Sequence, residues 1–142
     1  MDALELMATL HDLGKIGISG SILTKPGLLN DAEWTEIKKH PEVGYRIALT
    51  IPELQGIANY ILSHHERWDG MGYPEGLKGE EIPYISRLIS VVDAFDAMTE
   101  KRPYRTTISE TEAAREIFRN AGTQFDPVIA EVFIAKVLEL TL

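Results

Sequence analysis

The sequence predicts an all-α fold, a helical bundle in one domain. Apolar residues recur in several segments at the three- and four-residue spacing of a helix face. Capping boxes or prolines stand in front of most of these segments, where helices begin. The 142 residues suffice for one domain with a single core. No repeat, low-complexity segment or interdomain linker divides them.

The first third of the chain contains three predicted helices. Residues 3–12 carry an apolar stripe, and residues 14–27, with four glycines and a proline, form a connector. Asn30 with Glu33 starts a helix that reaches about residue 39. His40 is expected to end it, because the residue before a proline is disfavoured in a helix. The third helix then spans about 42–49.

The remaining helices are predicted from prolines and capping residues. Pro52 precedes a helix over 53–65, and a long glycine-rich loop follows up to Pro83. The segments expected to be helical after that are about 83–99, 109–121 and a last helix from 127 onward. Trp34 and Trp68 are expected to be packing residues rather than ligand contacts.

The first predicted helix begins at residue 2 or 3 with no capping residue and is already apolar on one face. Two explanations stay open. Its packing partner lies elsewhere in the chain, or preceding helices are missing. An uncovered apolar face would also favour self-association.

Composition limits the classes of ligand and location. The net charge is −8, which argues against a DNA or RNA polymer as partner, although a small anion bound by a local basic cluster remains compatible. The most basic short run is EKRPYR, residues 100–105. No membrane segment or secretory signal is visible, and the absence of cysteine suits a reducing, cytoplasmic location. Any metal would be held by His, Asp and Glu.

Polar residues stand at inward positions of the predicted helices. They share a helix face with apolar residues four or seven positions earlier. One such histidine is more often a hydrogen-bonded core residue than a ligand. Their joint placement on four helices favours a metal site, because buried charges are paired or bind metal. The inward residues are His11, Asp12, His64, His65 and Asp93, with His40 at a helix end.

Six imidazole and carboxylate groups exceed the needs of one catalytic ion. They suffice for two ions with a bridging aspartate. Iron, manganese, zinc and nickel all suit such ligands, and a mixed nitrogen and oxygen site with open positions favours iron or manganese. Paired metals are the usual apparatus for cleaving phosphoesters. The sequence therefore predicts a binuclear phosphoesterase centre.

The motif HDLGK, residues 11–15, resembles the signature of the HD phosphohydrolase superfamily. HDLGKIGI, KPGLLNDAEWTEIKKHPEVGY, HHERWDGMGYP and SVVDAFDAMTEKRPYR together resemble the HD-GYP subfamily of cyclic di-GMP phosphodiesterases. The resemblance covers essentially the whole chain. It implies an all-α fold of the HD type with two or three divalent ions, usually iron or manganese.

The resemblance also implies roles for individual residues. The metal ligands would be His11, Asp12 as the bridge, His40, His64, His65 and Asp93. Lys15 would face a substrate phosphate and act with Asp12 in catalysis. Tyr73 of the glycine-rich loop, Arg102 and Arg105 would contact the dinucleotide.

One departure from the family pattern lies at the start of the chain. Family members carry an upstream helix with a further histidine, and sometimes a glutamate, as ligands. We therefore expect residues 1–142 to form a single HD-GYP domain that lacks its first helices, with reduced activity. A sensory or receiver domain is expected upstream in the full protein.

Three functions follow from these residues. The leading hypothesis is a metal-dependent phosphodiesterase that opens cyclic di-GMP to linear pGpG, with GMP left open as a further product, in bacterial second-messenger signalling. The alternative is a catalytically impaired module that binds cyclic di-GMP or a partner protein. The Gly-Tyr-Pro loop and the RPYR run argue against a third class, an HD phosphohydrolase acting on another nucleotide.

Overall fold

The computed structural model describes residues 2–100 and 107–141. These residues form helices and no strand, with one isolated bridge between Ala121 and Phe125. The all-α prediction is therefore confirmed. The α-helices are α1 (Ala3–Leu10), α2 (Gly20–Leu23), α3 (Asp31–Ile37), α4 (His40–Thr50), α5 (Ala58–Ser63), α6 (Tyr84–Thr99), α7 (Glu110–Arg119) and α8 (Pro127–Val132). Shorter turns are η1 (Leu13–Gly17), η2 (Pro52–Ile57), η3 (Gly79–Glu81) and the π turn η4 (Phe133–Val137).

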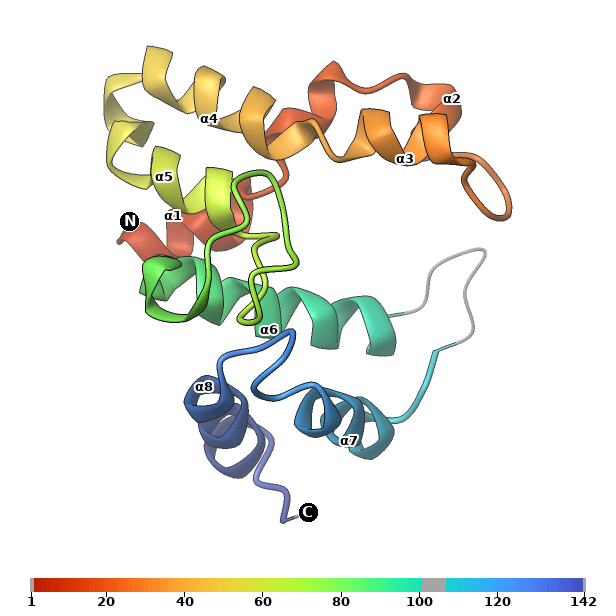
Figure 1. Ribbon diagram of the computed structural model, residues 1–142, viewed down its shortest axis with the longest axis vertical. Helices are drawn as coiled ribbons and strands as arrows, with labels where there is room; N and C mark the ends of the chain where they lie inside the picture. The colour runs from red at the N-terminus through yellow and green to blue at the C-terminus, as the bar shows by residue number, and fades with distance from the viewer. Residues whose placement is uncertain (1, 101–106, 142) are drawn as a thin grey trace.

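Helix α6 runs through the middle of the molecule and separates two apolar clusters. Helices α1, α4 and α5 lie on one side of it, and α7 and α8 lie on the other (Figure 1). Ile89 of α6 packs in the first cluster with Met7 and Ile61. Two positions further on, Val91 packs in the second cluster with residues of α7 and α8. A helix with apolar residues on two faces belongs in the centre of a bundle.

Helix α1 is capped, which corrects the expectation that it begins without a capping residue. The Asp2 carboxylate accepts a hydrogen bond from the backbone N–H of Glu5 (2.9 Å), and the Glu5 carboxylate accepts one from the N–H of Asp2 (3.0 Å). This is a capping box, which satisfies two N–H groups that a helix start leaves free. Met7 is fully buried, while Leu4 is 40% exposed.

The boundary at His40 was predicted wrongly. His40 is the first residue of α4 rather than the end of the preceding helix, which stops at Ile37. Pro41 is tolerated there because the first helical turn needs no N–H donor. The helix predicted over 53–65 is likewise a 3-10 turn followed by the short α5.

A glycine lets the chain bring η1 against α4. A Cβ on Gly14 would collide with the carbonyl oxygen of His40 and lie 2.5 Å from the nitrogen of Gly44. Only glycine permits this close backbone contact. The approach places the segment after His11 and Asp12 beside the start of α4.

Trp34 was expected to be a packing residue, but the structure leaves it outside the core. It is 49% exposed on α3, a helix with no buried residue. Trp68 is partly buried, and the guanidinium of Arg87 lies 5.7 Å from its ring centre. None of the helices in the described part of the chain has the length and apolar character needed to cross a bilayer.

Candidate metal centre

Both adjacent pairs of predicted ligands follow the end of a helix. His11 and Asp12 come directly after α1, and His64 and His65 come directly after α5. Within a helix, neighbouring side chains diverge by about 100° and cannot share one target. Where the helix ends, both members of a pair can turn toward the same point. The helix ends thus add to the inward phase from which the sequence predicted these residues, because His11 and His64 still have helical backbone angles.

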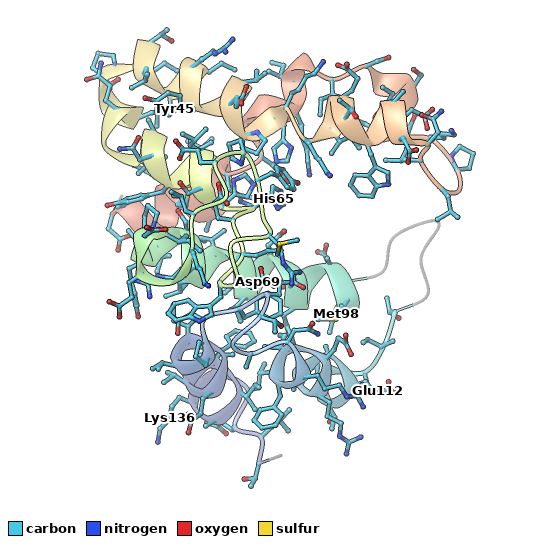
Figure 2. The ribbon with its side chains drawn as sticks, viewed as in Figure 1. Tyr45, His65, Asp69, Met98, Glu112 and Lys136 are labelled. Atoms are coloured by element: carbon cyan, nitrogen blue, oxygen red, sulfur yellow. The ribbon has the colours of Figure 1, made fainter. Side chains whose placement is uncertain are left out.

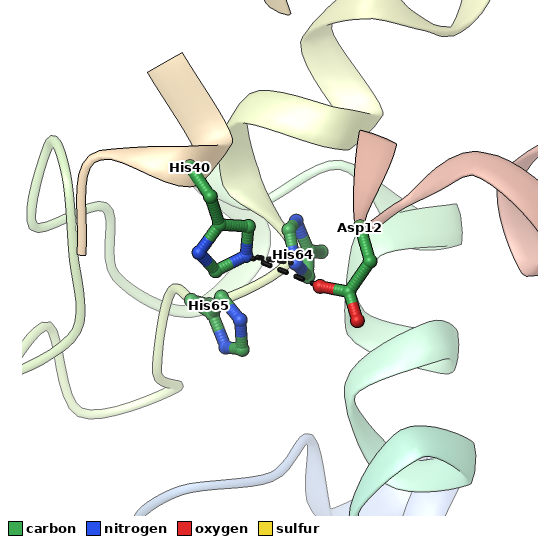
Figure 3. Close-up of side chains that lie close together, drawn as sticks. All are labelled: Asp12, His40, His64 and His65. Carbon is green, nitrogen blue, oxygen red and sulfur yellow. Dashed lines mark hydrogen bonds and ion pairs between the residues drawn. The ribbon is translucent and has the colours of Figure 1, made fainter. Parts of the chain in front are cut away.

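Four of the six predicted ligands converge on one point (Figure 3). One ligand atom from each of Asp12, His40, His64 and His65 lies within 4.8 Å of all the others. His40, predicted at a helix end, is therefore inside the tightest group. Figure 2 places His65 between the upper helices and α6.

The other two predicted ligands, His11 and Asp93, form a pair beside Asp12 and His64, and the ring centres of His11 and His64 are 5.4 Å apart. His11 Nε2 is 3.6 Å from Asp93 Oδ1 and 3.7 Å from Asp12 Oδ2. The other oxygen of Asp12, Oδ1, lies 3.3 Å from His40 Nε2. Oδ1 of Asp12 thus faces His40, and Oδ2 faces His11. This is the arrangement that a bridging carboxylate between two ions requires.

Hydrogen bonds to the backbone fix the tautomer of two buried histidines. Nδ1–H of His40 donates to the carbonyl oxygen of Ile37 (2.7 Å), and Nδ1–H of His64 donates to that of Ile61 (2.6 Å). The Nε2 atoms are then acceptors, and they face each other at 3.3 Å. Two lone pairs at this distance repel unless a cation lies beside both. Such backbone bonds to the outer nitrogen are typical of metal-bound histidines.

Burial keeps three of the histidines neutral. It lowers the pKa of His40, holds that of His64 well below its ordinary value, and lowers that of His65 to about 4. Metals bind the neutral imidazole, so these rings are ready to coordinate without losing a proton at neutral pH.

The pKa of the fourth histidine, His11, shifts in the opposite direction. A hydrogen bond to Asp93 raises the pKa of His11, and the same bond lowers the pKa of the Asp93 carboxyl group. His11 therefore holds its proton more readily than the other three histidines, and a cation bound there would compete with that proton. The donors present, imidazole and carboxylate, fit a divalent ion of the iron or manganese type.

Lys15 and Tyr73 stand beside the cluster. The Lys15 ammonium lies 2.5 Å from Asp12 Oδ2, the oxygen that also faces His11. The Tyr73 ring stacks on His65 with 5.1 Å between ring centres and 21° between planes. Burial raises the pKa of the Tyr73 hydroxyl to about 12, so the hydroxyl keeps its proton. Arg102 and Arg105 lie outside the described residues.

Glu66 anchors the loop that carries Tyr73, a role that the sequence analysis missed. Its carboxylate accepts hydrogen bonds from the backbone N–H groups of Glu75 (2.7 Å), Gly76 (3.1 Å) and Leu77 (3.1 Å). Glu66 is only 4% exposed. Gly72 packs onto the same residue, because a Cβ there would lie 2.6 Å from Glu66 Cα. The loop therefore closes around one carboxylate, and no periodicity in the sequence marks it.

Comparison with known proteins gives a consistent result. The HD domain family matches residues 2–129. A cyclic di-GMP phosphodiesterase of Thermotoga maritima is 44% identical over 97% of this chain and 38% of its own length. One from Vibrio cholerae is 43% identical over 90% of this chain and 27% of its own. A 3'3'-cGAMP-specific phosphodiesterase of Vibrio cholerae is 39% identical over 84% of this chain and 26% of its own length.

Solved structures agree. A cyclic GMP-AMP specific phosphodiesterase of Vibrio cholerae has a TM-score of 0.70 at 25% identity, covering 98% of this chain and 39% of its own. An HDG"Y"P protein from Bdellovibrio bacteriovorus has a TM-score of 0.71 at 20% identity, over 97% and 44%, which shows the fold.

The chain spans well under half the length of these curated relatives. The resemblance to the HD-GYP phosphodiesterases is confirmed. With 128 of its 142 residues matched, from 2 to 129, the chain belongs to the HD domain family.

Proposed function

We propose that this chain is the catalytic part of a metal-dependent phosphodiesterase that hydrolyses cyclic di-GMP to linear pGpG in bacterial second-messenger signalling. The names of the relatives support the phosphodiesterase class, and both cyclic di-GMP and cGAMP occur among their substrates. The observation that carries the proposal is the convergence of His40, His64 and His65 on Asp12.

The proposed ligands divide between two ions, iron or manganese, with Asp12 as the bridge. His40, His64 and His65 would hold one ion, and His11 and Asp93 the other. A metal pair supplies Lewis-acid activation of water and of the phosphoryl group when bound.

Side chains around the cluster take the remaining roles. Lys15 pairs with a phosphoryl oxygen of the substrate and neutralises the charge that grows on it. Tyr73, protonated and held against His65, donates a hydrogen bond to the dinucleotide. Arg102 and Arg105 are proposed as phosphate contacts. A regulatory domain upstream, and self-association, are proposed for the full protein.

One observation favours a second function, a module that binds cyclic di-GMP without turnover. Within residues 2–100 and 107–141, the set around His11 consists of His11, Asp93 and one oxygen of Asp12, and that oxygen already pairs with Lys15. A protein with only the His40 site filled would bind phosphate and hydrolyse poorly.

The test is turnover of cyclic di-GMP by the purified protein after loading with Mn²⁺ or Fe²⁺, with metal content measured in parallel. We expect pGpG to appear, and Asp12→Asn to abolish it while the fold persists. The exposed Lys136→Ala serves as the control. Binding without turnover at full metal occupancy would establish the second function instead.

A further inference from the structure

The exposed face of α3 carries an aromatic ring and a cation that the proposed metal site does not use. Trp34 is 49% exposed, and Lys38, the cap residue that follows α3, is exposed as well. The two are four positions apart and therefore share a face, with about one turn, 5.4 Å, between them.

This face continues the metal centre through direct contacts. Tyr73 stacks on the candidate ligand His65. The ammonium of Lys38 lies 5.6 Å from the centre of the Tyr73 ring. Lys38 also lines a shallow hollow of about 460 Å³, together with Asp31, Trp34 and Thr35.

The groups in this hollow match a nucleotide. An exposed indole is a stacking surface for a base, and stacking is worth a factor of about 5 to 160 in affinity per base. An ammonium pairs with phosphate. Asp31 has a carboxylate, which only accepts hydrogen bonds. The Watson–Crick edge of guanine offers two adjacent donors to it, whereas that of adenine presents an acceptor at the same ring nitrogen.

We propose that the hollow on α3 is a guanine nucleotide subsite. Trp34 stacks on one base of a cyclic dinucleotide, Lys38 pairs with the adjoining phosphate, and Asp31 reads the guanine edge. This inference rests on the proposed function, because the metal centre must bind the scissile phosphate while α3 holds the base.

The first test reports binding without turnover. The chain has two tryptophans, so Trp68→Phe leaves Trp34 as the sole fluorescent indole and Trp34→Phe leaves Trp68. A phosphorothioate analogue of cyclic di-GMP, which resists hydrolysis, is added to each metal-loaded variant. We expect the fluorescence of Trp34 to be quenched on binding and that of Trp68 to stay unchanged.

The second test separates recognition of the guanine base from hydrolysis of the phosphodiester. Trp34→Ala should raise KM for cyclic di-GMP about 5- to 160-fold with little change in kcat, and Trp34→Phe should restore most of the affinity. Methyl p-nitrophenyl phosphate is a phosphodiester without a nucleobase. Its rate of hydrolysis should be the same in the unchanged protein, Trp34→Ala and Trp34→Phe. Asp31→Ala should reduce the preference for cyclic di-GMP over cyclic di-AMP.

The outcomes distinguish this inference from the proposed function. Quenching of Trp34 in a protein that never hydrolyses cyclic di-GMP would refute the phosphodiesterase and support the subsite. Normal hydrolysis with an unchanged KM in Trp34→Ala and an unquenched Trp34 would overturn the subsite alone. An unchanged base preference in Asp31→Ala would overturn the assignment to guanine.

Discussion

The Nε2 atoms of His40 and His64 face each other at 3.3 Å, while both rings donate from Nδ1 to a backbone carbonyl oxygen. Each backbone bond fixes one ring, so neither can turn away from the other. The repulsion between the two lone pairs is relieved when a cation binds both. A cation would relieve this repulsion at the point where the start of α4 meets the end of α5.

Metal should stabilise the fold measurably. Adding Mn²⁺ at about 100 times its Kd contributes about 2.7 kcal/mol to the free energy of unfolding, and a chelator should remove that gain. Calorimetric melting with and without Mn²⁺ checks this. His64→Ala should lose most of the metal-dependent shift in Tm, whereas the exposed Lys136→Ala should keep it. An equal shift in both variants would contradict a site at His64.

The metal-free protein should lose stability in acid. His65 has a pKa of about 4 in the fold and about 6.5 when unfolded, and the pKa of His64 and His40 is lowered too. From pH 6.5 down to 4 the unfolded chain therefore takes up protons that the folded chain does not. The stability that these three histidines contribute is fully present above pH 6.5 and falls through this window. His11, whose pKa is raised, acts above this window: its contribution to stability is fully present below pH 6.5 and is lost as the pH rises through its folded pKa.

Urea unfolding of the metal-free protein between pH 4 and 7.5 measures this dependence. His65→Asn removes one titrating ring and should flatten the profile between pH 6.5 and 4. A profile as steep as that of the unchanged protein would show that other groups control the acid response.

Glu66 should hold Tyr73 in place without binding metal. Glu66→Gln replaces one acceptor oxygen with an NH₂ group, which cannot accept from the loop N–H groups. A buried N–H left unpaired costs about 1–3 kcal/mol. We expect a drop in stability of that size, weaker dinucleotide binding and unchanged metal content. The matched control is Glu75→Gln, an exposed side chain in the same loop.

Gly14 should tolerate no side chain. Gly14→Ala places a methyl group against the backbone of α4, so η1 must shift and Asp12 must move from His40. We expect lower stability together with weaker metal binding, measured by melting and metal titration. Gly56→Ala, where nothing lies within 4 Å of the new Cβ, should change neither. Full metal affinity in Gly14→Ala would show that this contact does not position the ligands.

Signals within a few consecutive residues predicted most helices, whereas features that depend on contacts between distant residues were not predicted. The capping box at Asn30 is present as predicted because it needs only four consecutive residues. The start of α4 at His40 was missed because Pro41 allows both interpretations. The candidate ligands were predicted from their inward phase, and the two adjacent pairs among them follow the ends of α1 and α5. Nothing in the sequence pattern marks Glu66, whose partners lie 9 to 11 positions away.

Substitution of Lys15 should affect turnover without weakening metal binding. Its ammonium now pairs with Asp12 Oδ2, an oxygen proposed to bind metal. Lys15→Met removes this competing cation and keeps an apolar stem, so metal affinity should stay the same or rise. Turnover of cyclic di-GMP should fall by about 10²-fold or more, since a charge that stabilises the phosphoryl oxygens is lost. Lys15→Arg, which keeps the charge, should recover part of the rate. Metal titration and single-turnover kinetics on the same samples decide the point, and loss of metal in Lys15→Met would make Lys15 a structural partner of Asp12 instead.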